Sequence, residues 1–150
     1  MASGVIPGDK YRSLVATVWD AIDIYKDPAV FLATFHQARR ECALLYAAYF
    51  CQYEVCNGGF YQFFHNSTGV LAPEAIAGFT AIGQTQIADV VRQAMNVWDS
   101  PYVRDCDSRR DSLPSRDVFR EFDDRFYALI DTEAGGFDVA ADSYAVLSGA

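Results

Sequence analysis

Hydrophobic residues recur along this chain at intervals of three and four positions, the spacing that places side chains on one face of an α-helix. The first such stripe predicts a helix over residues 10–25, and its members are Tyr11, Leu14, Val15, Val18, Ile22 and Tyr25. Asp27 and Pro28 then form a good helix start, because an acidic side chain can cap the first turn and proline tolerates the first helical position. A short helix through Phe31 and Phe35 follows, either separate or merged with the next one.

A nearly continuous apolar stretch occupies residues 42–53, near the middle of the sequence. A helix that is apolar on nearly every side is normally surrounded by other helices. We therefore predict a long central helix over about residues 36–56. Asn57, Gly58 and Gly59 are expected to end it, since Asn and Gly tolerate the left-handed backbone conformation that closes helix C-termini.

Downstream, the same periodicity predicts four more helices, over residues 60–66, 73–82, 87–98 and 117–131. Ser115 is the expected cap of the last one, whose inward residues are Phe119, Phe122, Phe126, Leu129 and Ile130. The polar segment 99–116 contains two prolines and is predicted to be a loop. The tail, residues 135–150, is ambiguous and has room for one short helix around Tyr144.

Strands are not indicated, because no alternating pattern of convincing length occurs. The prediction is therefore an all-α protein with a single compact domain over residues 1–150. Six or more helices surround the central 36–56 helix, and residues 1–9 form a flexible N-terminus.

Composition fits a folded protein. Hydrophobic residues make up 51% of the chain, with two Trp, nine Tyr and eleven Phe, which is not a disordered composition. The longest fully apolar run, residues 42–51, is half of the roughly 20 residues that span a bilayer. The N-terminus lacks the basic and apolar regions of a secretory signal. We therefore expect a cytoplasmic protein without membrane contact.

Four cysteines, Cys42, Cys51, Cys56 and Cys106, are too widely spaced for a typical zinc site, and the chain has only two histidines. We predict no metal and no cofactor. The net charge of −8 argues against direct nucleic-acid binding through a basic surface. Residues 99–150 carry twelve acids and six bases, a net of −6, so most of the acidity lies in the C-terminal third.

Residues 54–69 read EVCNGGFYQFFHNSTG and place many polar groups beside the apolar central helix. Glu54 points from the apolar surface, and a carboxylate there needs hydrogen-bond donors. The free backbone amides of Phe60 and Tyr61 lie at the start of the next helix. Gln62 and Asn66, four residues apart, could complete the network. We interpret the segment as a polar clamp that fixes two helices, formed by Glu54, Asn57, Gly58, Gly59, Gln62 and Asn66.

Two other interpretations of this segment stay open. A small enzyme or ligand-binding domain could be centred on Glu54, Asn57, His65 and Asn66, with Glu54 as general base and His65 as its partner. A solvent-reachable pocket with Glu54 at its wall would favour that alternative, whereas a buried Glu54 would favour the clamp. No recognisable nucleophile, metal or phosphate motif accompanies these residues, so we predict a non-enzymatic protein. A binding surface is the other alternative, because four aromatic residues occupy four faces of a short helix: Phe60, Tyr61, Phe63 and Phe64.

The pattern E-x-x-N-G-G-x-x-x-x-F-x-N-x-x-G resembles the signature of the DNA-mimic protein family. It is carried here by Glu54, Asn57, Gly58, Gly59, Phe64, Asn66 and Gly69. The resemblance implies an all-helical, acidic homodimer whose surface imitates the DNA phosphate backbone. The implied partner is a basic DNA-binding protein, such as a transcription factor whose DNA-binding site is occupied. The motif residues mark the fold and do not supply the mimicking charges.

Those charges have to come from other positions. On a helix over residues 117–131, four acids fall within about 80° of arc, namely Asp117, Glu121, Asp124 and Asp131, and Asp123 flanks them. Four charges over roughly 21 Å are dilute, because duplex DNA carries about a dozen over that length. A mimic would need a second subunit or more acids on the same surface, for which the candidates are Asp20, Asp23 and Asp27. Four bases would also have to point elsewhere: Arg104, Arg109, Arg110 and Arg116. An ordinary solvated acidic face is the alternative.

Overall fold

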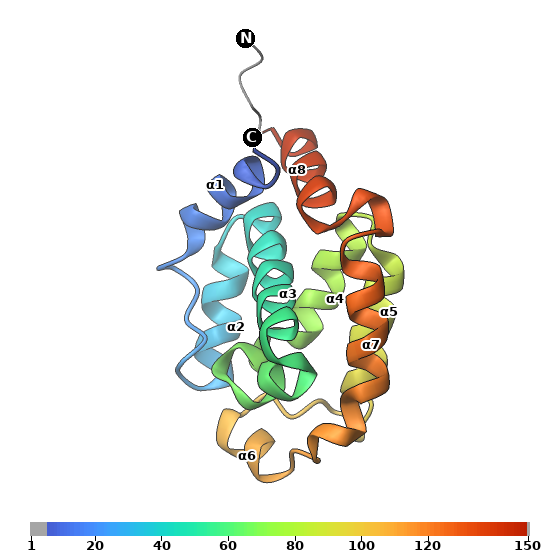
Figure 1. Ribbon diagram of the computed structural model, residues 1–150. Coiled ribbons are helices and arrows are strands. Elements are labelled where there is room, and N and C mark those ends of the chain that lie inside the picture. Colours follow the sequence, from blue (N-terminus) through green and yellow to red (C-terminus); the bar gives the residue numbers. More distant parts are fainter. Residues whose placement is uncertain (1–5, 150) are drawn as a thin grey trace.

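The computed structural model describes residues 6–149, in which eight α-helices and three 3₁₀ turns occur and no strand is present (Figure 1). The helices are α1 (Asp9–Val18), α2 (Pro28–Gln37), α3 (Arg40–His65), α4 (Ala72–Ala81), α5 (Thr85–Met95), α6 (Cys106–Asp111), α7 (Arg120–Ile130) and α8 (Phe137–Leu147). The 3₁₀ turns are Ser67–Leu71, Arg116–Phe119 and Glu133–Gly135. The predicted all-α, single-domain fold is confirmed.

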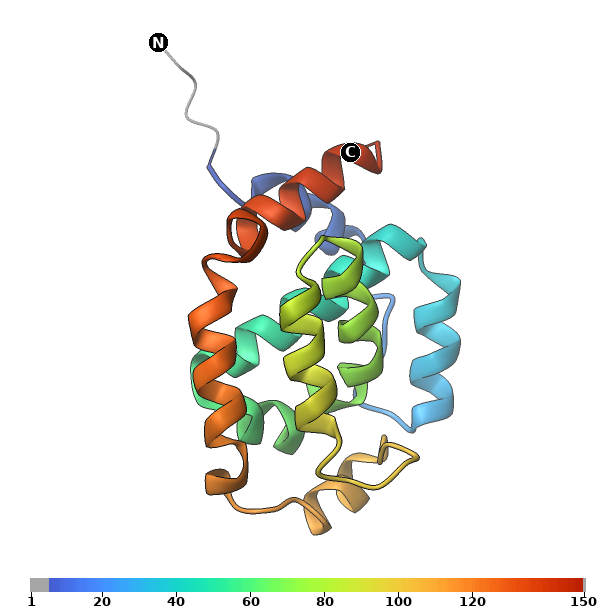
Figure 2. The same cartoon turned by 90° about the vertical axis from the view of Figure 1, so that its right-hand side faces the viewer.

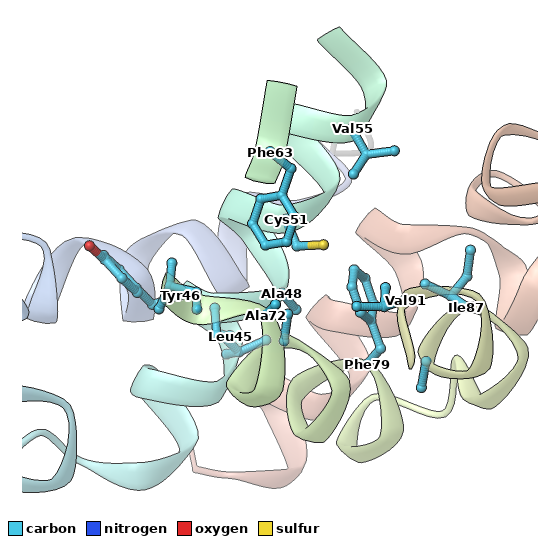
Figure 3. Packing of buried hydrophobic residues seen from close by; sticks show 14 of the residues in the cluster. Leu45, Tyr46, Ala48, Cys51, Val55, Phe63, Ala72, Phe79, Ile87 and Val91 are labelled. Carbon is cyan, nitrogen blue, oxygen red and sulfur yellow. The ribbon is translucent and has the colours of Figure 1, made fainter. Parts of the chain in front are cut away.

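The long helix α3 runs through the middle of the molecule (Figures 1 and 2). It contacts α1 on one side and α4 and α7 on the other, while α6 closes one end and α8 packs on α1 at the opposite end. The core follows α3, whose Leu45, Cys51 and Val55 are fully buried against Phe79 of α4 and Val91 of α5 (Figure 3). Burial of α3 on nearly all sides explains why its sequence is apolar on nearly all sides.

Two predicted boundaries near the N-terminus are wrong. Helix α1 ends at Val18 rather than at residue 25, and the chain turns there, with the Ala21 and Ile22 amides both donating to the Val18 carbonyl. A second turn follows, in which the Asp23 carboxylate accepts the Tyr25 and Lys26 amides. Tyr25, predicted to face inward, is 82% exposed. Of the predicted flexible segment 1–9, residues 1–5 lie outside the described residues, whereas Gly8 is buried and donates to Asp142 of α8.

The central helix is longer than predicted. Helix α2 ends at Gln37, and α3 begins at Arg40 and extends past residue 56 to His65. The predicted stop is present as a break within α3, since Gly58 and Gly59 leave the helical conformation and Gly59 has a φ of +77°. That φ lies in the left-handed region, which glycine adopts without strain. The chain resumes a helix at once, so the predicted 60–66 helix is the second half of α3.

The C-terminal third holds more regular structure than its sequence suggests. The segment 99–116, predicted to be a loop, contains helix α6, whose start is capped by the Asp105 carboxylate on the Ser108 amide. Ser115 precedes a 3₁₀ turn and makes no side-chain cap, so the last predicted helix is divided into Arg116–Phe119 and α7. The ambiguous tail contains α8, which joins the core through Phe137 and Ala141.

No helix within residues 6–149 combines the length and apolar character needed to traverse a bilayer.

Candidate functional site

The break in α3 is bridged by three polar side chains. Glu54, which is only 8% exposed, precedes the break, and its Oε2 accepts hydrogen bonds from Gln62 Nε2 at 2.8 Å and from Asn66 Nδ2 at 3.1 Å. Both donors belong to the residues that follow the break. The carboxylate therefore ties the two halves of α3 together, and its buried charge is satisfied by amide donors.

The backbone amide of Phe60 has a different partner from the one predicted. It donates to Asp123 Oδ1 of α7 at 2.8 Å and not to Glu54. A Cβ added at Gly59 would lie 2.7 Å from Asp123 Oδ2, so glycine is required for this close approach. Asn57, by contrast, is exposed and makes no side-chain hydrogen bond within residues 6–149.

Asp123 therefore holds α7 against the break and belongs to the polar network as much as to the acidic surface. Partial burial raises the pKa of its carboxyl group, the Phe60 hydrogen bond lowers it, and the nearby Asp124 raises it again. Together these effects raise the pKa of the Asp123 carboxyl group above the ordinary aspartate value, so folding disfavours its ionisation. The contribution of Asp123 to stability is thus expected to fall as the pH rises from the ordinary aspartate pKa to the raised one.

We expect Asp123→Ala to lower the free energy of unfolding by about 0.5–2 kcal/mol, the usual cost of losing a cap on a free helical amide. Asp123→Asn keeps the acceptor oxygen and removes a charge that is partly desolvated, so it should leave stability within about 0.5 kcal/mol of the wild type. Urea unfolding at neutral pH measures both values. Equal losses in the two variants would show that the carboxylate charge, rather than the Phe60 hydrogen bond, is what matters.

Arginines from the 99–116 segment close the C-terminal end of α3. Arg109 is 0% exposed, and its guanidinium donates to the carbonyls of Phe64, Asn66, Val103 and Arg104 at 2.7–3.3 Å. Arg110 donates to the His65 carbonyl at 2.7 Å. Carbonyls at the end of a helix lack intrahelical partners and carry partial negative charge, which favours cations there.

The other two arginines also contact neighbouring elements of the fold. Arg104 forms a two-pronged ion pair with Glu74 of α4, at 2.7 and 2.9 Å. Arg116 donates to the Gly58 carbonyl and lies 4.4 Å from the centre of the Tyr61 ring. These contacts hold the 99–116 segment in place. They could not be predicted from the sequence of this segment, which is polar and contains two prolines.

The pairing of Glu54 with His65 that the enzyme alternative calls for is not formed. A groove of about 340 Å³ lies beside the break, but Glu54 does not line it; the lining residues are Tyr61, Gln62, His65, Asn66 and Arg116. His65 is exposed, stacks on Tyr61 and has Asn66 Oδ1 3.4 Å from its Nδ1, with no hydrogen bond to Glu54. Within residues 6–149 no cluster of three His, Cys, Asp or Glu side chains is placed to hold a metal ion.

The four aromatics after the break do not form a free binding surface. Phe60, Phe63 and Phe64 are all fully buried, and only Tyr61 is partly exposed. Neighbouring elements enclose this half of α3 around the three phenylalanines and leave Tyr61 at the surface. Phe126 of α7 lies 5.6 Å from Phe60, and Trp98 and Phe119 lie 4.9 and 5.4 Å from Phe64, measured between ring centres.

The acids around α7 form a less regular face than the sequence predicts. We name the α7 face after its four residues: Asp117, Glu121, Asp124 and Asp131. Asp117 lies on the 3₁₀ turn, so it does not share the register of α7, and it pairs with Arg120 at 2.5 Å. Glu121 lies 3.8 Å from Arg125. Only Asp124 and Asp131 are exposed without an ion-pair partner within residues 6–149, so arginines interrupt the face.

The three N-terminal candidates do not extend the α7 face. Asp20, Asp23 and Asp27 belong to the turn between α1 and α2, which lies on the other side of α3 and α4 from α7 (Figures 1 and 2). Two of them also accept hydrogen bonds from backbone amides. The hydrogen bond from the Tyr25 amide is the main cause that lowers the pKa of the Asp23 carboxyl group. Asp27 caps α2 by accepting a hydrogen bond from the Val30 amide at 3.0 Å.

Instead, the α1–α2 turn adjoins α6. A polar hollow there is lined by Asp27, Asp105 and Asp107, together with Lys26 and Arg110. We name this second acidic surface the α6 face; its members are Asp20, Asp23, Asp27, Asp105 and Asp107. Asp105 and Asp107 were not among the predicted site residues, and only the folding of α6 brings them beside the α1–α2 turn.

Across residues 6–149, carboxylates outnumber cations among exposed side chains that lack an ion pair. The carboxylates are Asp9, Asp20, Asp27, Asp99, Asp105, Asp107, Asp111, Asp124 and Asp131. The cations are Lys10, Arg40, Arg110 and Arg116. The surface therefore carries an excess of negative charge that the protein itself does not neutralise.

Fold and surface together define a small, acidic, all-α domain with a clamped break in its central helix. Residues 37–146 match the family model described as DMP19-like protein, and the chain belongs to this family. The matched range includes residues 54–69, on which the resemblance to the DNA-mimic family is based. No curated protein and no solved structure matches the chain significantly.

Proposed function

We propose that this protein is a non-enzymatic DNA mimic that binds the DNA-contacting surface of a basic DNA-binding protein. The observation that carries the proposal is the excess of exposed, unpaired carboxylates described above, in a chain of net charge −8. Such a surface attracts a basic partner and repels nucleic acid. Membership of the DMP19-like family supports DNA mimicry in particular, since that is a family of DNA mimics.

One subunit supplies only part of a DNA-like surface. The α7 face and the α6 face lie on different sides of the molecule, and arginines interrupt the α7 face. A homodimer, as predicted from the resemblance, would present acidic faces of two subunits side by side to one partner and so lengthen the negatively charged surface. The proposal places the protein in the cytoplasm, where it can meet DNA-binding proteins.

Removing charges from the acidic faces should weaken partner binding. We compare Asp124→Asn/Asp131→Asn on the α7 face and Asp105→Asn/Asp107→Asn on the α6 face, where asparagine preserves the cap of α6. Immobilised protein is exposed to extract of the source cells, and retained DNA-binding proteins are titrated. At least one of the two variants should bind about three- to tenfold more weakly, because each exposed ion pair contributes up to about 1 kcal/mol. Added salt should weaken the wild-type complex too.

A matched control removes the same amount of charge elsewhere. Asp9→Asn/Glu41→Gln acts at the starts of α1 and α3, outside both acidic faces, and should retain wild-type affinity. If both face variants behave like this control, or if binding is independent of salt, the proposed mimicry is wrong.

A further inference from the structure

A groove of about 380 Å³ runs between the α1–α2 turn and α3. Its walls are aromatic and acidic, and the lining side chains are Trp19, Asp20, Ile22, Asp23, Ile24, Tyr25, Lys26, Tyr46 and Phe50. The groove shares Tyr25 and Lys26 with the polar hollow beside α6, so it continues the α6 face. None of these residues takes part in the clamp around Glu54.

The aromatic wall is built by packing of α1 against α3. Ring centres lie 5.0 Å apart for Trp19 and Phe50, 6.2 Å for Trp19 and Tyr46, and 4.8 Å for Tyr46 and Phe50. Tyr46 points away from Phe79 and Val91, which fill the other side of the core (Figure 3). Trp19 remains 47% exposed, although tryptophan is usually well buried. The wall thus offers open ring surface at the protein exterior.

The charged rim fits a cation. Asp20 is exposed and has no ion pair within residues 6–149. Asp23 Oδ1 accepts the Tyr25 and Lys26 amides, and Asp23 Oδ2 pairs with Lys26 Nζ at 3.7 Å. The Lys26 side chain is 70% exposed, so this pair is weak and easily exchanged. Carboxylates beside exposed aromatic rings form a good site for an organic cation, because ring faces attract cations and the acids neutralise the charge.

We propose that this groove accepts an arginine side chain of a basic partner protein, with the guanidinium stacked on Trp19 and paired with Asp20 and Asp23. This assignment rests on the proposed function, because the basic DNA-binding protein is the source of the arginine. It identifies one contact that this partner makes. Arginine fits better than lysine because its planar guanidinium stacks on rings, binds carboxylates in two-pronged fashion and is less strongly hydrated. A second copy of this chain fits less well, since the acidic rims of two identical grooves would repel each other.

The test uses short fluorescein-labelled peptides of alternating glycine and arginine, with lysine or uncharged citrulline in place of arginine for comparison. Fluorescence anisotropy measures their affinity for the full chain. The arginine peptide should bind about two- to fivefold more tightly than the lysine peptide, and the citrulline peptide more weakly than both. Trp19→Ala and Asp20→Asn/Asp23→Asn should each weaken binding of the arginine peptide by a similar factor. Asparagine at position 23 keeps the oxygen that shapes the turn.

Two further variants separate a specific site from general attraction. Lys26→Ala removes the competing cation and should tighten binding of the arginine peptide about twofold. Trp19→Phe keeps a ring, so it should retain peptide binding while losing any peptide-dependent change in tryptophan emission. The remaining Trp98 is buried and hydrogen-bonded to Ser112, so it does not report on the groove.

Unchanged arginine-peptide affinity in both Trp19→Ala and Asp20→Asn/Asp23→Asn would overturn the groove assignment. So would self-association of the wild type, measured by sedimentation, that Trp19→Ala abolishes, because the groove would then be a contact between copies. The proposed function is judged separately. If the α7-face or α6-face variants lose the partner from the extract while the groove variants keep it, only the groove proposal is contradicted. If no DNA-binding protein is retained from the extract, the proposed DNA mimicry is contradicted even when the arginine peptide binds.

Discussion

Replacing Arg109 with alanine is expected to lower the free energy of unfolding by more than about 3 kcal/mol. The fully buried guanidinium satisfies four backbone carbonyls, and these would be left without donors in a newly formed cavity. Domains of this size are stabilised by about 5–15 kcal/mol in total, so the loss is a large share. Urea unfolding measures it. Arg109→Lys should also destabilise, because a compact ammonium cannot reproduce the fork of donors.

Arg110 provides the matched control. It is the next residue in α6, and it also donates to a carbonyl at the end of α3, but its side chain is exposed. Water can replace that bond, so Arg110→Ala should cost no more than about 0.5 kcal/mol. Similar stability losses for the two alanine variants would contradict the structural role given to Arg109.

Gly78→Ala is expected to destabilise the protein by about 1–3 kcal/mol. Gly78 lies where α4 packs closely on α3: an added Cβ would collide with the Leu44 carbonyl oxygen and lie 3.1 Å from the Ala48 Cβ. A backbone oxygen inside a helix cannot move away alone, so the two helices would have to separate. This cost outweighs the gain of up to about 1 kcal/mol that alanine normally brings to a helix.

Thr80→Ala is the corresponding control on the same helix. Thr80 is exposed on α4, and its hydroxyl donates only to the Ile76 carbonyl of its own helix. Its replacement should change the free energy of unfolding by less than about 0.5 kcal/mol. A Gly78→Ala variant as stable as Thr80→Ala would mean that α3 and α4 are not in close contact.

The helices could be predicted from the sequence where their own periodicity determines them. The stripe of Ile87, Val90, Val91 and Ala94 gives α5, and the apolar stretch after residue 41 gives the core of α3. Gly58 and Gly59 marked the break correctly. These features are local, because a helix with one apolar face needs only a surface to pack on.

Features that depend on partners distant in the sequence could not be predicted. Helix α6 exists in a polar segment because Arg109 finds carbonyls some 45 residues earlier in the chain. Asp123 was assigned to the acidic surface, but the structure brings it to the Phe60 amide, 63 residues away. A helical wheel cannot show either contact. It also placed Asp117 on one face with α7, although a 3₁₀ turn changes its register.

The polar clamp is intermediate between these cases. The spacing of Gln62 and Asn66 indicated a shared face, and both do donate to Glu54. The sequence could not show that the amides after the break would go to α7 instead, because that requires knowing how α7 packs. The result separates two sets of acids. Glu54 and Asp123 serve the fold, whereas Asp124 and Asp131 of the α7 face and Asp20 and Asp107 of the α6 face remain available to a partner.

The most direct test of the proposed mimicry is competition with duplex DNA for the basic protein retained from cell extract. Both ligands are proposed to occupy the same surface, so increasing duplex DNA should release the bound protein completely. The apparent affinity should fall in proportion to the DNA concentration, with no complex that contains all three components. A stable ternary complex, or retained proteins that do not bind DNA, would contradict the claim that these carboxylates imitate the DNA backbone.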